Sequence, residues 1–331
     1  MSIEHWINDG LMAVFFLLIG LELEREIYVG ELSEIKNAIL PISAALGGMV
    51  VPAGIFLLFN YGTTTQAGAG IPTATDIAFS LGILSLLGKK VPITLKIFLT
   101  ALAVVDDLGA IMIIALFYTG TLIWTNLIVS LLIFFGLLVM KRFRVNNLIP
   151  YILGGIAMWY FMLHSGIHPT ITGVLLAFAI PFGTGDKFSP SYRLQLLLHK
   201  PVAFLVLPLF ALANTAIIVG SNWQDAFTEP YGLGVVAGLI IGKPLGITLF
   251  SFAAVSVGLC SLPGELNWKH IIGAGFLAGI GFTMSIFITL LAFNDTQIIN
   301  NIKAVILGAS AIAGVTGFLI LKRTLKTEQE E

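Results

Sequence analysis

The chain has 331 residues, of which 57% are hydrophobic and 11% are charged, and its mean hydropathy is +0.98. Soluble domains carry about 25% charged residues, so this composition excludes a soluble globular protein and indicates an all-α polytopic membrane protein. The net charge of −1 and the lack of a basic patch predict no nucleic-acid partner. A single cysteine, Cys260, excludes an internal disulfide framework.

The chain contains a series of apolar runs long enough for transmembrane helices, which need about 20 mostly apolar residues. We predict eleven spans, near residues 7–24, 38–60, 70–88, 92–118, 123–140, 147–163, 166–182, 201–220, 231–257, 268–293 and 300–321. No composition shift or linker separates them, so we predict one membrane transporter domain over residues 1–331.

Basic residues predict the orientation of these spans. Except for Lys96, Lys243 and Lys303, every Lys and Arg lies in or beside alternate connections, and the intervening connections have none. The positive-inside rule then places the basic connections and the C-terminus in the cytoplasm. With eleven spans the chain starts outside, although it has no signal peptide pattern. We therefore expect that a preceding helix is absent from this chain; the alternative is a short translocated tail.

Two adjacent carboxylates, Asp106 and Asp107, lie near the middle of the apolar segment 92–118. A carboxylate at the centre of a bilayer costs about 3 kcal/mol on insertion scales, so such residues usually face a cavity or a partner. A structural acidic pair at a helix end is the alternative, and the central position of the pair argues against it.

Lys243 lies near the middle of the segment 231–257. A lysine at that depth is either neutral or paired with a buried acid. The carboxylates of the other segments favour the paired form.

Two of the predicted spans are interrupted. Pro72, Thr75 and Asp76 interrupt the segment 70–88, and a glycine-rich stretch at 277–285 interrupts a late one. Broken helices survive in a membrane only where protein or a cavity surrounds the break. A helix N-cap at the outer surface is the alternative for the first break. A second break in the other half of the chain instead points to a transporter site built from broken helices.

The segments also predict an inverted repeat. Three spans at 38–118 begin on the cytoplasmic side, and three spans at 231–321 begin outside, with further helices at 123–220 between them. Each unit has its interrupted helix in the middle, so the two interrupted helices are predicted to cross at mid-membrane. This prediction depends on topology, because the two units share few identical residues.

The chemistry of this residue set favours cation and proton exchange. Carboxylate oxygens suit small hard cations, and two carboxylates in a low dielectric make protons and a cation compete for one place. The sequence lacks a Walker A motif, HExxH, and the GxGD-type pattern of intramembrane aspartyl proteases, so we predict no enzyme and no cofactor. A cation channel or a non-transporting membrane scaffold remains the alternative.

Five motifs resemble the NhaA-type sodium/proton antiporters. They are Trp6–Glu22, Thr73–Phe79, Val105–Ala110, Gly242–Gly246 and Gly279–Phe287. The resemblance runs from residue 5 to 323 and implies a secondary antiporter in the bacterial inner membrane. It implies electrogenic expulsion of sodium or lithium in exchange for protons, in pH and sodium homeostasis.

The resemblance also implies roles for single residues. Asp106 and Asp107 would bind the transported sodium and the protons, with Asp106 paired to Lys243 and Asp107 as the main cation ligand. Thr75 and Asp76 would line the crossing of the broken helices. A cytoplasmic group would give the pH response: Glu22, Arg25, Glu26 and His199.

The chain departs from the family pattern at two places. Gln195 and Leu196 stand where the family has an acid and a histidine, so pH activation is expected to differ. The family has twelve helices, and an outer hairpin after the first helix forms its dimer contact. This chain would lack both, which leaves a homodimer open.

Overall fold

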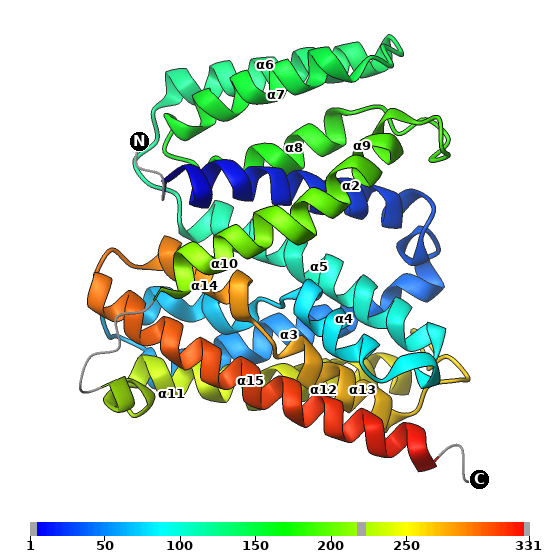
Figure 1. The fold of residues 1–331 in the computed structure, drawn as a ribbon, viewed down its shortest axis with the longest axis vertical. Helices are drawn as coiled ribbons and strands as arrows, with labels where there is room; N and C mark the ends of the chain where they lie inside the picture. Colours follow the sequence, from blue (N-terminus) through cyan, green and yellow to red (C-terminus); the bar gives the residue numbers. More distant parts are fainter. Residues whose placement is uncertain (1–4, 217–222, 328–331) are drawn as a thin grey trace. The chain divides into compact units, whose positions relative to one another are not determined.

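The computed structural model describes residues 5–216 and 223–327, and Figure 1 traces them as a succession of helices. Within these ranges no residue lies in a β-strand. The helices, with short 3₁₀ or π segments labelled η, are η1 (Trp6–Leu11), α2 (Met12–Tyr28), η2 (Glu31–Ser33), α3 (Ile35–Asn60), η3 (Gln66–Thr73), α4 (Ile77–Ser85), η4 (Gly88–Lys90), α5 (Ile93–Phe117), α6 (Trp124–Arg142), α7 (Leu148–Leu163), α8 (Ile171–Ala179), α9 (Pro190–Pro201), η5 (Val202–Val206), α10 (Leu207–Thr215), η6 (Trp223–Phe227), α11 (Pro230–Ala237), η7 (Gly238–Gly242), α12 (Lys243–Ser256), α13 (Trp268–Ala278), α14 (Phe282–Ala292) and α15 (Thr296–Thr327).

The part of the chain that the structure describes has eight helical segments long and apolar enough to cross a membrane. The bent pair α13 and α14 makes a ninth, while α7 and α8 are shorter. Each of the eleven predicted segments contains a helix, which confirms an all-α polytopic membrane protein. One boundary differs: the predicted segment 201–220 belongs to a helical run that begins at Pro190, because its polar first turns hid its start.

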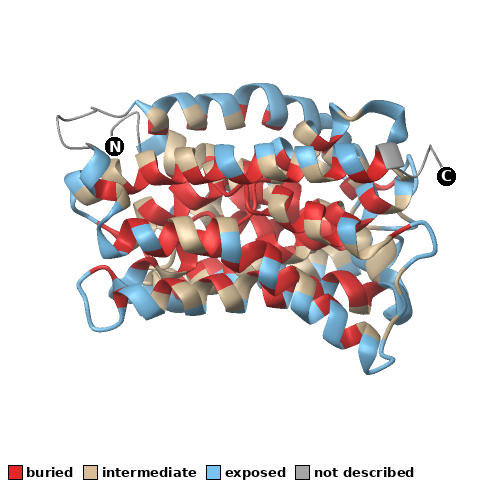
Figure 2. Cartoon of the chain, turned by 90° about the horizontal axis from the view of Figure 1, so that it is seen from below, coloured by how far each residue is buried: buried red, intermediate tan, exposed pale blue. Residues whose placement is uncertain are grey.

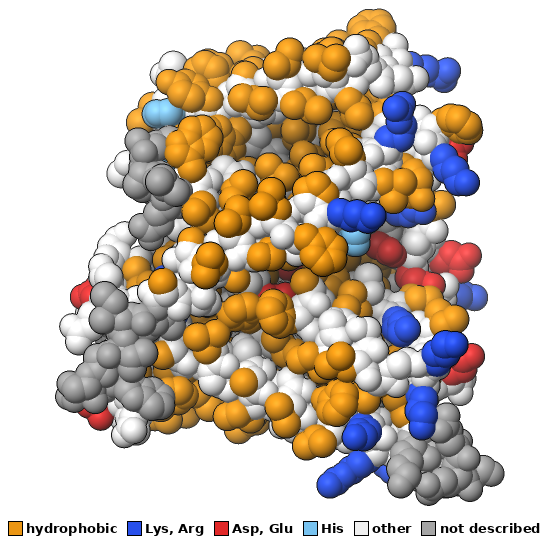
Figure 3. Space-filling model, viewed as in Figure 1, with side chains coloured by type: hydrophobic (Ala, Val, Ile, Leu, Met, Phe, Trp, Pro, Cys, Tyr) orange, Lys and Arg blue, Asp and Glu red, His pale blue; other side chains and the backbone are white. Residues whose placement is uncertain are grey.

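The outer faces of the helices are apolar. Leu58, Phe204 and Leu132 are 83%, 80% and 65% exposed, and many other large hydrophobic side chains are exposed as well. Figure 2 shows buried and exposed faces along the same helices, and Figure 3 shows hydrophobic side chains spread across the visible face. Soluble proteins rarely expose contiguous apolar patches of this extent, so these faces are suited to lipid.

Residue contacts divide the chain into two compact units. Unit 1 comprises residues 1–33 and 111–215, and unit 2 comprises residues 34–110 and 216–331. Helix α5 contributes its first part to unit 2 and its last turns to unit 1. Unit 2 therefore brings together most of the two predicted repeat segments, which are far apart in the sequence.

In unit 1, α2 packs closely against α8 through glycine. A Cβ atom on Gly173 would lie 2.2 Å from the carbonyl oxygen of Ala13, and one on Gly20 would lie 2.6 Å from Cβ of Ala177. Helices α6 and α7 run side by side (Figure 1). Small residues permit such close helix contacts where no hydrophobic effect drives association.

In unit 2, α3 packs against α12, α13 against α15, and η3 against α14. A buried cluster joins α3, α4, α5, α12, α13 and α15, with Leu84, Leu99, Ile247 and Leu277 all at most 1% exposed. This packing holds the two interrupted helices at the centre of the unit.

A short π segment, η7, precedes Lys243 on the helical run from α11 to α12. Pro244 removes a backbone donor and would crowd the carbonyl four residues earlier in a regular helix. The wider π turn at Gly238–Gly242 accommodates that loss. The π turn therefore lets the helix continue through Lys243 without a break.

Gly47 is required where α3 crosses α12. A Cβ atom on Gly47 would lie 2.1 Å from the carbonyl oxygen of Gly246, a backbone atom that cannot turn aside. We expect Gly47→Ala to lower the free energy of unfolding by about 1–3 kcal/mol through overpacking. Gly54→Ala on the same helix is the matched control, because a Cβ atom there meets nothing within 4 Å. Thermal unfolding in detergent compares them, and equal shifts would contradict the close crossing.

Candidate functional site

The first interrupted helix breaks at residues 74–76, between η3 and α4. Asp76 is the N-cap of α4, and its Oδ1 accepts a hydrogen bond of 3.1 Å from the backbone N–H of Phe79. The alternative of an N-cap was thus right in geometry. Its location at a surface was wrong, because Asp76 is only 3% exposed.

The second interrupted helix bends by 47° between α13 and α14 and meets the first break. The other oxygen of Asp76, Oδ2, accepts hydrogen bonds from the backbone N–H of Thr283, at 3.1 Å, and from the Thr283 hydroxyl. The backbone N–H of Asp76 donates to the carbonyl of Ile280 at 2.7 Å. One carboxylate therefore satisfies donors at the N-termini of both α4 and α14, where the helix dipoles are positive.

Two serine hydroxyls close the other ends of the breaks. Ser80 donates to the carbonyl of Leu277 at 2.8 Å, and Ser285 donates to the carbonyl of Ile71 at 2.7 Å. Each serine lies four residues after the N-cap of its own helix. Both acceptors lie near the C-terminal ends of the opposite half-helices, where backbone carbonyls lack intrahelical partners.

Lys243 reaches the same place from α12. Its ammonium group donates to Oδ2 of Asp106 and to the carbonyl of Thr73. The Thr75 hydroxyl contacts the same Asp106 oxygen and lies 2.9 Å from the carbonyl oxygen of Ala278. Lys243 is 0% exposed and Asp106 is 1% exposed, so this is a buried ion pair, as favoured for this lysine from the sequence.

Asp107 is also 1% exposed and follows Asp106 on α5. Successive side chains on a helix point about 100° apart, so the two carboxylates face different directions. One lysine beside two buried carboxylates leaves an excess negative charge, which in a low dielectric requires a proton or a cation. Oδ1 of Asp106 accepts no hydrogen bond from the described residues, so it can receive either.

The family described as Na+/H+ antiporter 1 matches residues 1–321 of this sequence. The chain belongs to this antiporter family. A Na(+)/H(+) antiporter NhaA from Flavobacterium psychrophilum is 68% identical over 325 residues, covering 98% of this chain and 85% of the relative. One from Dechloromonas aromatica is 62% identical, covering 97% and 84%. A third, from Clostridium beijerinckii, is 48% identical, covering 100% and 84%.

The antiporter's predicted pH-response residues lie in unit 1, and only some of them meet. Nδ1 of His199 is 3.7 Å from Oε1 of Glu22. The Arg25 guanidinium instead lies over the ring of Tyr192, 4.5 Å from its centre. Glu26 accepts a backbone hydrogen bond of 3.1 Å from Glu31. Helix α9 contributes both His199 and Tyr192 to this contact with α2, and the sequence alone did not indicate Tyr192.

Glu24 belongs to the same charged stretch of α2, where a run of charges would usually form a solvated helix end, but it is buried. Its side chain is 0% exposed, and Oε1 is 3.0 Å from Nζ of Lys141, which also donates to the carbonyl of Phe178 at 2.8 Å. Glu24 lies two residues from Glu22 and from Glu26, which turns it toward the opposite side of the helix. That spacing was the available signal for a separate partner.

The Glu24–Lys141 pair predicts a stability effect in unit 1. We expect Lys141→Met to lower the free energy of unfolding by about 3 kcal/mol, because it leaves a buried carboxylate without its cation. Adding Glu24→Gln should recover part of the loss. Thermal unfolding measures both, with Arg142→Met, an exposed neighbour, as control. Equal losses of stability from Lys141→Met and Arg142→Met would refute a structural role for the Glu24–Lys141 pair.

The N-terminal end of α2 has a second group of ionisable residues. Oδ2 of Asp9 is 3.4 Å from Nε2 of His5, and Oδ1 is 3.9 Å from Nδ1 of His168.

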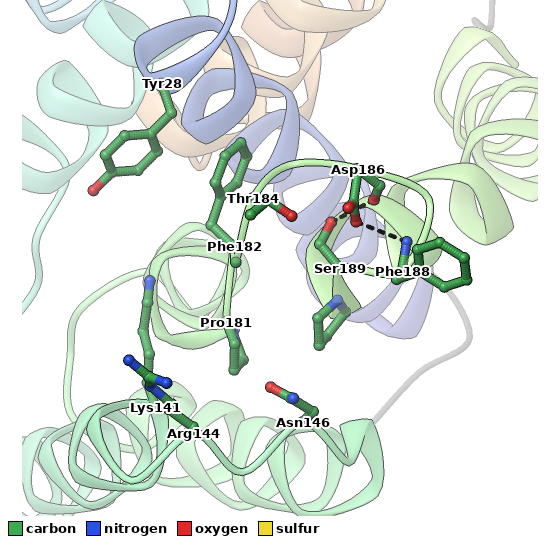
Figure 4. A pocket seen from close by; sticks show the side chains of 12 residues that line it. Tyr28, Lys141, Arg144, Asn146, Pro181, Phe182, Thr184, Asp186, Phe188 and Ser189 are labelled. Atoms are coloured by element: carbon green, nitrogen blue, oxygen red, sulfur yellow. Dashed lines mark hydrogen bonds between the residues drawn. The ribbon is translucent and has the colours of Figure 1, made fainter.

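Unit 1 contains a hollow of about 710 Å³. Figure 4 shows Lys141 and Arg144 on one side of it and Asp186 on the other. Asp186 accepts a hydrogen bond of 2.9 Å from the backbone N–H of Phe188, and this bond lowers the pKa of Asp186. None of the nine site residues predicted from the sequence lines this hollow.

Proposed function

We propose that this antiporter exchanges sodium or lithium for protons at Asp106 and Asp107, without catalysing a chemical reaction. The observation that carries the proposal is the buried ion pair of Asp106 and Lys243, with a second buried carboxylate beside it, at the crossing of two broken helices. Such a set holds either a cation or protons, because both compensate the charge of the carboxylates.

The proposed exchange has two half-reactions. A sodium ion arriving from the cytoplasm binds Asp107 as its main ligand, and the two carboxylates release their protons. On the other side protons return to both carboxylates, and sodium leaves. Two protons then enter for each sodium expelled, so one net positive charge moves inward and the exchange is electrogenic.

Lys243 supports this exchange by its position. A proton on Asp106 removes the charge that Lys243 compensates, and loss of that proton restores the pair. The hydrogen bonding of Thr75 changes with the same proton, since its hydroxyl contacts both Asp106 and the carbonyl of Ala278. Asp76 stays with the helix N-termini that it caps.

The inverted repeat of 38–118 and 231–321 is part of this proposal. The matching positions of Ser80 and Ser285, each four residues after an N-cap and each bonded to the opposite broken helix, support it. An inverted repeat offers two equivalent ways to open a central site, one to each side.

We further place the protein in the bacterial inner membrane with a cytoplasmic C-terminus, from the distribution of basic connections. The contact of Glu22 with His199 supports a pH response at that side.

The decisive experiment uses the purified chain in liposomes that contain a pH-sensitive dye. A sodium pulse outside should drive proton release from the lumen, and the rate should change when potassium and valinomycin set the membrane potential. Tracer sodium entry without proton movement would instead identify a channel. No flux of either ion would leave a scaffold and overturn the proposal.

A further inference from the structure

Thr283 makes two hydrogen bonds to one oxygen of Asp76. Its backbone N–H and its hydroxyl both donate to Oδ2, and its side chain is buried, with the residue 2% exposed. Thr283 is the second residue of α14, on the other broken helix and 207 residues further along the chain. A bond between a hydroxyl and a carboxylate is stronger than one between neutral groups. This contact is therefore a strong side-chain tie between the breaks.

Asp76 is covalently next to Thr75, whose hydroxyl contacts Asp106. Residues 74–76 lie outside any helix, so helical hydrogen bonds do not fix this short segment. Its orientation depends on tertiary contacts: Thr73 accepts from Lys243, and the Thr75 hydroxyl lies beside the carbonyl of Ala278. Asp76 bonds through its backbone N–H to Ile280, and through its carboxylate to Thr283 and the N-terminus of α4. A change at Thr283 thus alters the contacts of Asp76, the residue next to Thr75.

We propose that Thr283 is a positioning residue for the exchange reaction. Its hydroxyl fixes Asp76, and Asp76 holds Thr75 in the orientation that serves the Asp106 carboxylate. The inference rests on the proposed sodium/proton exchange. The Thr283 hydroxyl donates to Asp76 and not to Asp106 or Asp107.

Thr289 provides a matched control on the same helix. It is a threonine that is 0% exposed, and its hydroxyl donates only within α14, to the carbonyl of Ser285 at 2.8 Å. Valine has nearly the same shape as threonine, so a valine at either position removes a buried hydroxyl without changing the size of the side chain. Only the change at position 283 removes a bond to the first broken helix.

The transport experiment compares three variants in the liposome assay. We expect Thr283→Val to raise the sodium KM by about tenfold, the loss typical of a charge-assisted bond, while the maximal rate changes less than threefold. Thr283→Ser keeps the hydroxyl and should stay within twofold of the unchanged chain, as should Thr289→Val. Equal KM values for Thr283→Val and Thr289→Val would overturn the positioning role.

A double-mutant cycle separates this inference from the proposed function. Thermal unfolding is measured for Thr283→Val, Asp76→Ala and the double variant. The double variant should lose less than the sum of the single losses, because both remove one bond. Additive losses would overturn the contact, whether or not the chain transports sodium. Conversely, coupling without any exchange by the unchanged chain would refute the proposed function alone.

A folding defect is also informative. If Thr283→Val does not give a monodisperse protein, Thr283→Ala replaces it in the same assay. Failure of both to fold, with Thr289→Val intact, would mean that the bond serves the fold and would overturn a role in exchange.

Discussion

Replacing Asp107 with asparagine is expected to reduce sodium-driven proton release to the level of protein-free liposomes. Asparagine keeps the size of the side chain and one acceptor oxygen, but it cannot bind and release a proton. It also removes the negative charge that a sodium ion requires in a site shielded from water. Asp107 is 1% exposed, so bulk water cannot take over as a ligand for the cation.

The control for this change is Asp295→Asn, an exposed carboxylate that caps the start of α15. Asparagine also caps helices well, so fold and transport should both persist. Thermal unfolding of Asp107→Asn should stay close to that of the unchanged chain, because the substitution removes a buried charge. Exchange retained in Asp107→Asn would remove Asp107 from the site and leave Asp106 as the sole carrier.

Replacing Lys243 with methionine is expected to lower the free energy of unfolding by about 3–5 kcal/mol, the usual loss when one partner of a buried ion pair is removed. The loss follows from burial, since Lys243 and Asp106 are both inaccessible to solvent. The carbonyl of Thr73 loses its donor as well. Detergent-solubilised protein should therefore melt well below the unchanged chain.

The double variant Lys243→Met with Asp106→Asn tests the cause. It removes both charges, so it should recover a large part of the stability lost by Lys243→Met, although transport should stay impaired. Lys269→Met, at the exposed start of α13, is the control for loss of a positive charge alone. If the double variant melts no higher than the single one, the pair does not account for the effect.

The sequence predicted the helices well where length and apolar content decided the result. It failed where a helix began in a polar stretch, as at Pro190, and it gave one span, 166–182, that is longer than the helix α8 observed within it. A helix needs hydrogen bonds along its backbone, and a polar first turn satisfies this as well as an apolar one. Hydropathy therefore cannot locate such a start.

The candidate site was predictable in part for a related reason. Asp106, Asp107 and Lys243 stand out because ionisable groups are costly in apolar surroundings. Thr283 and Ser285 do not stand out, because threonine and serine occur throughout membrane helices. Their roles depend on partners about 200 residues away, such as Asp76 and Ile71, and no local pattern encodes those pairings.

Glu24 illustrates the limit in the opposite direction. A run of charges at a helix end is usually hydrated, and Glu22, Arg25 and Glu26 are indeed partly exposed. Glu24 shares their position along the chain but points to another side of α2, where Lys141 meets it. The sequence fixes the spacing of these residues, yet the packing of the other helices decides which of them lose contact with water.

The two serine bonds at the crossing have a mechanical consequence. Ser80 ties α4 to α13, and Ser285 ties α14 to η3. The topology predicts that α4 and α13 share one side of the membrane and that α14 and η3 share the other. The crossing then consists of two pairs of half-helices, α4 with α13 and α14 with η3. Asp76 connects the two pairs, because it bonds to the N-termini of α4 and α14. A half-helix that tilts should therefore move together with the other half-helix of its pair, unless the serine bond between them breaks.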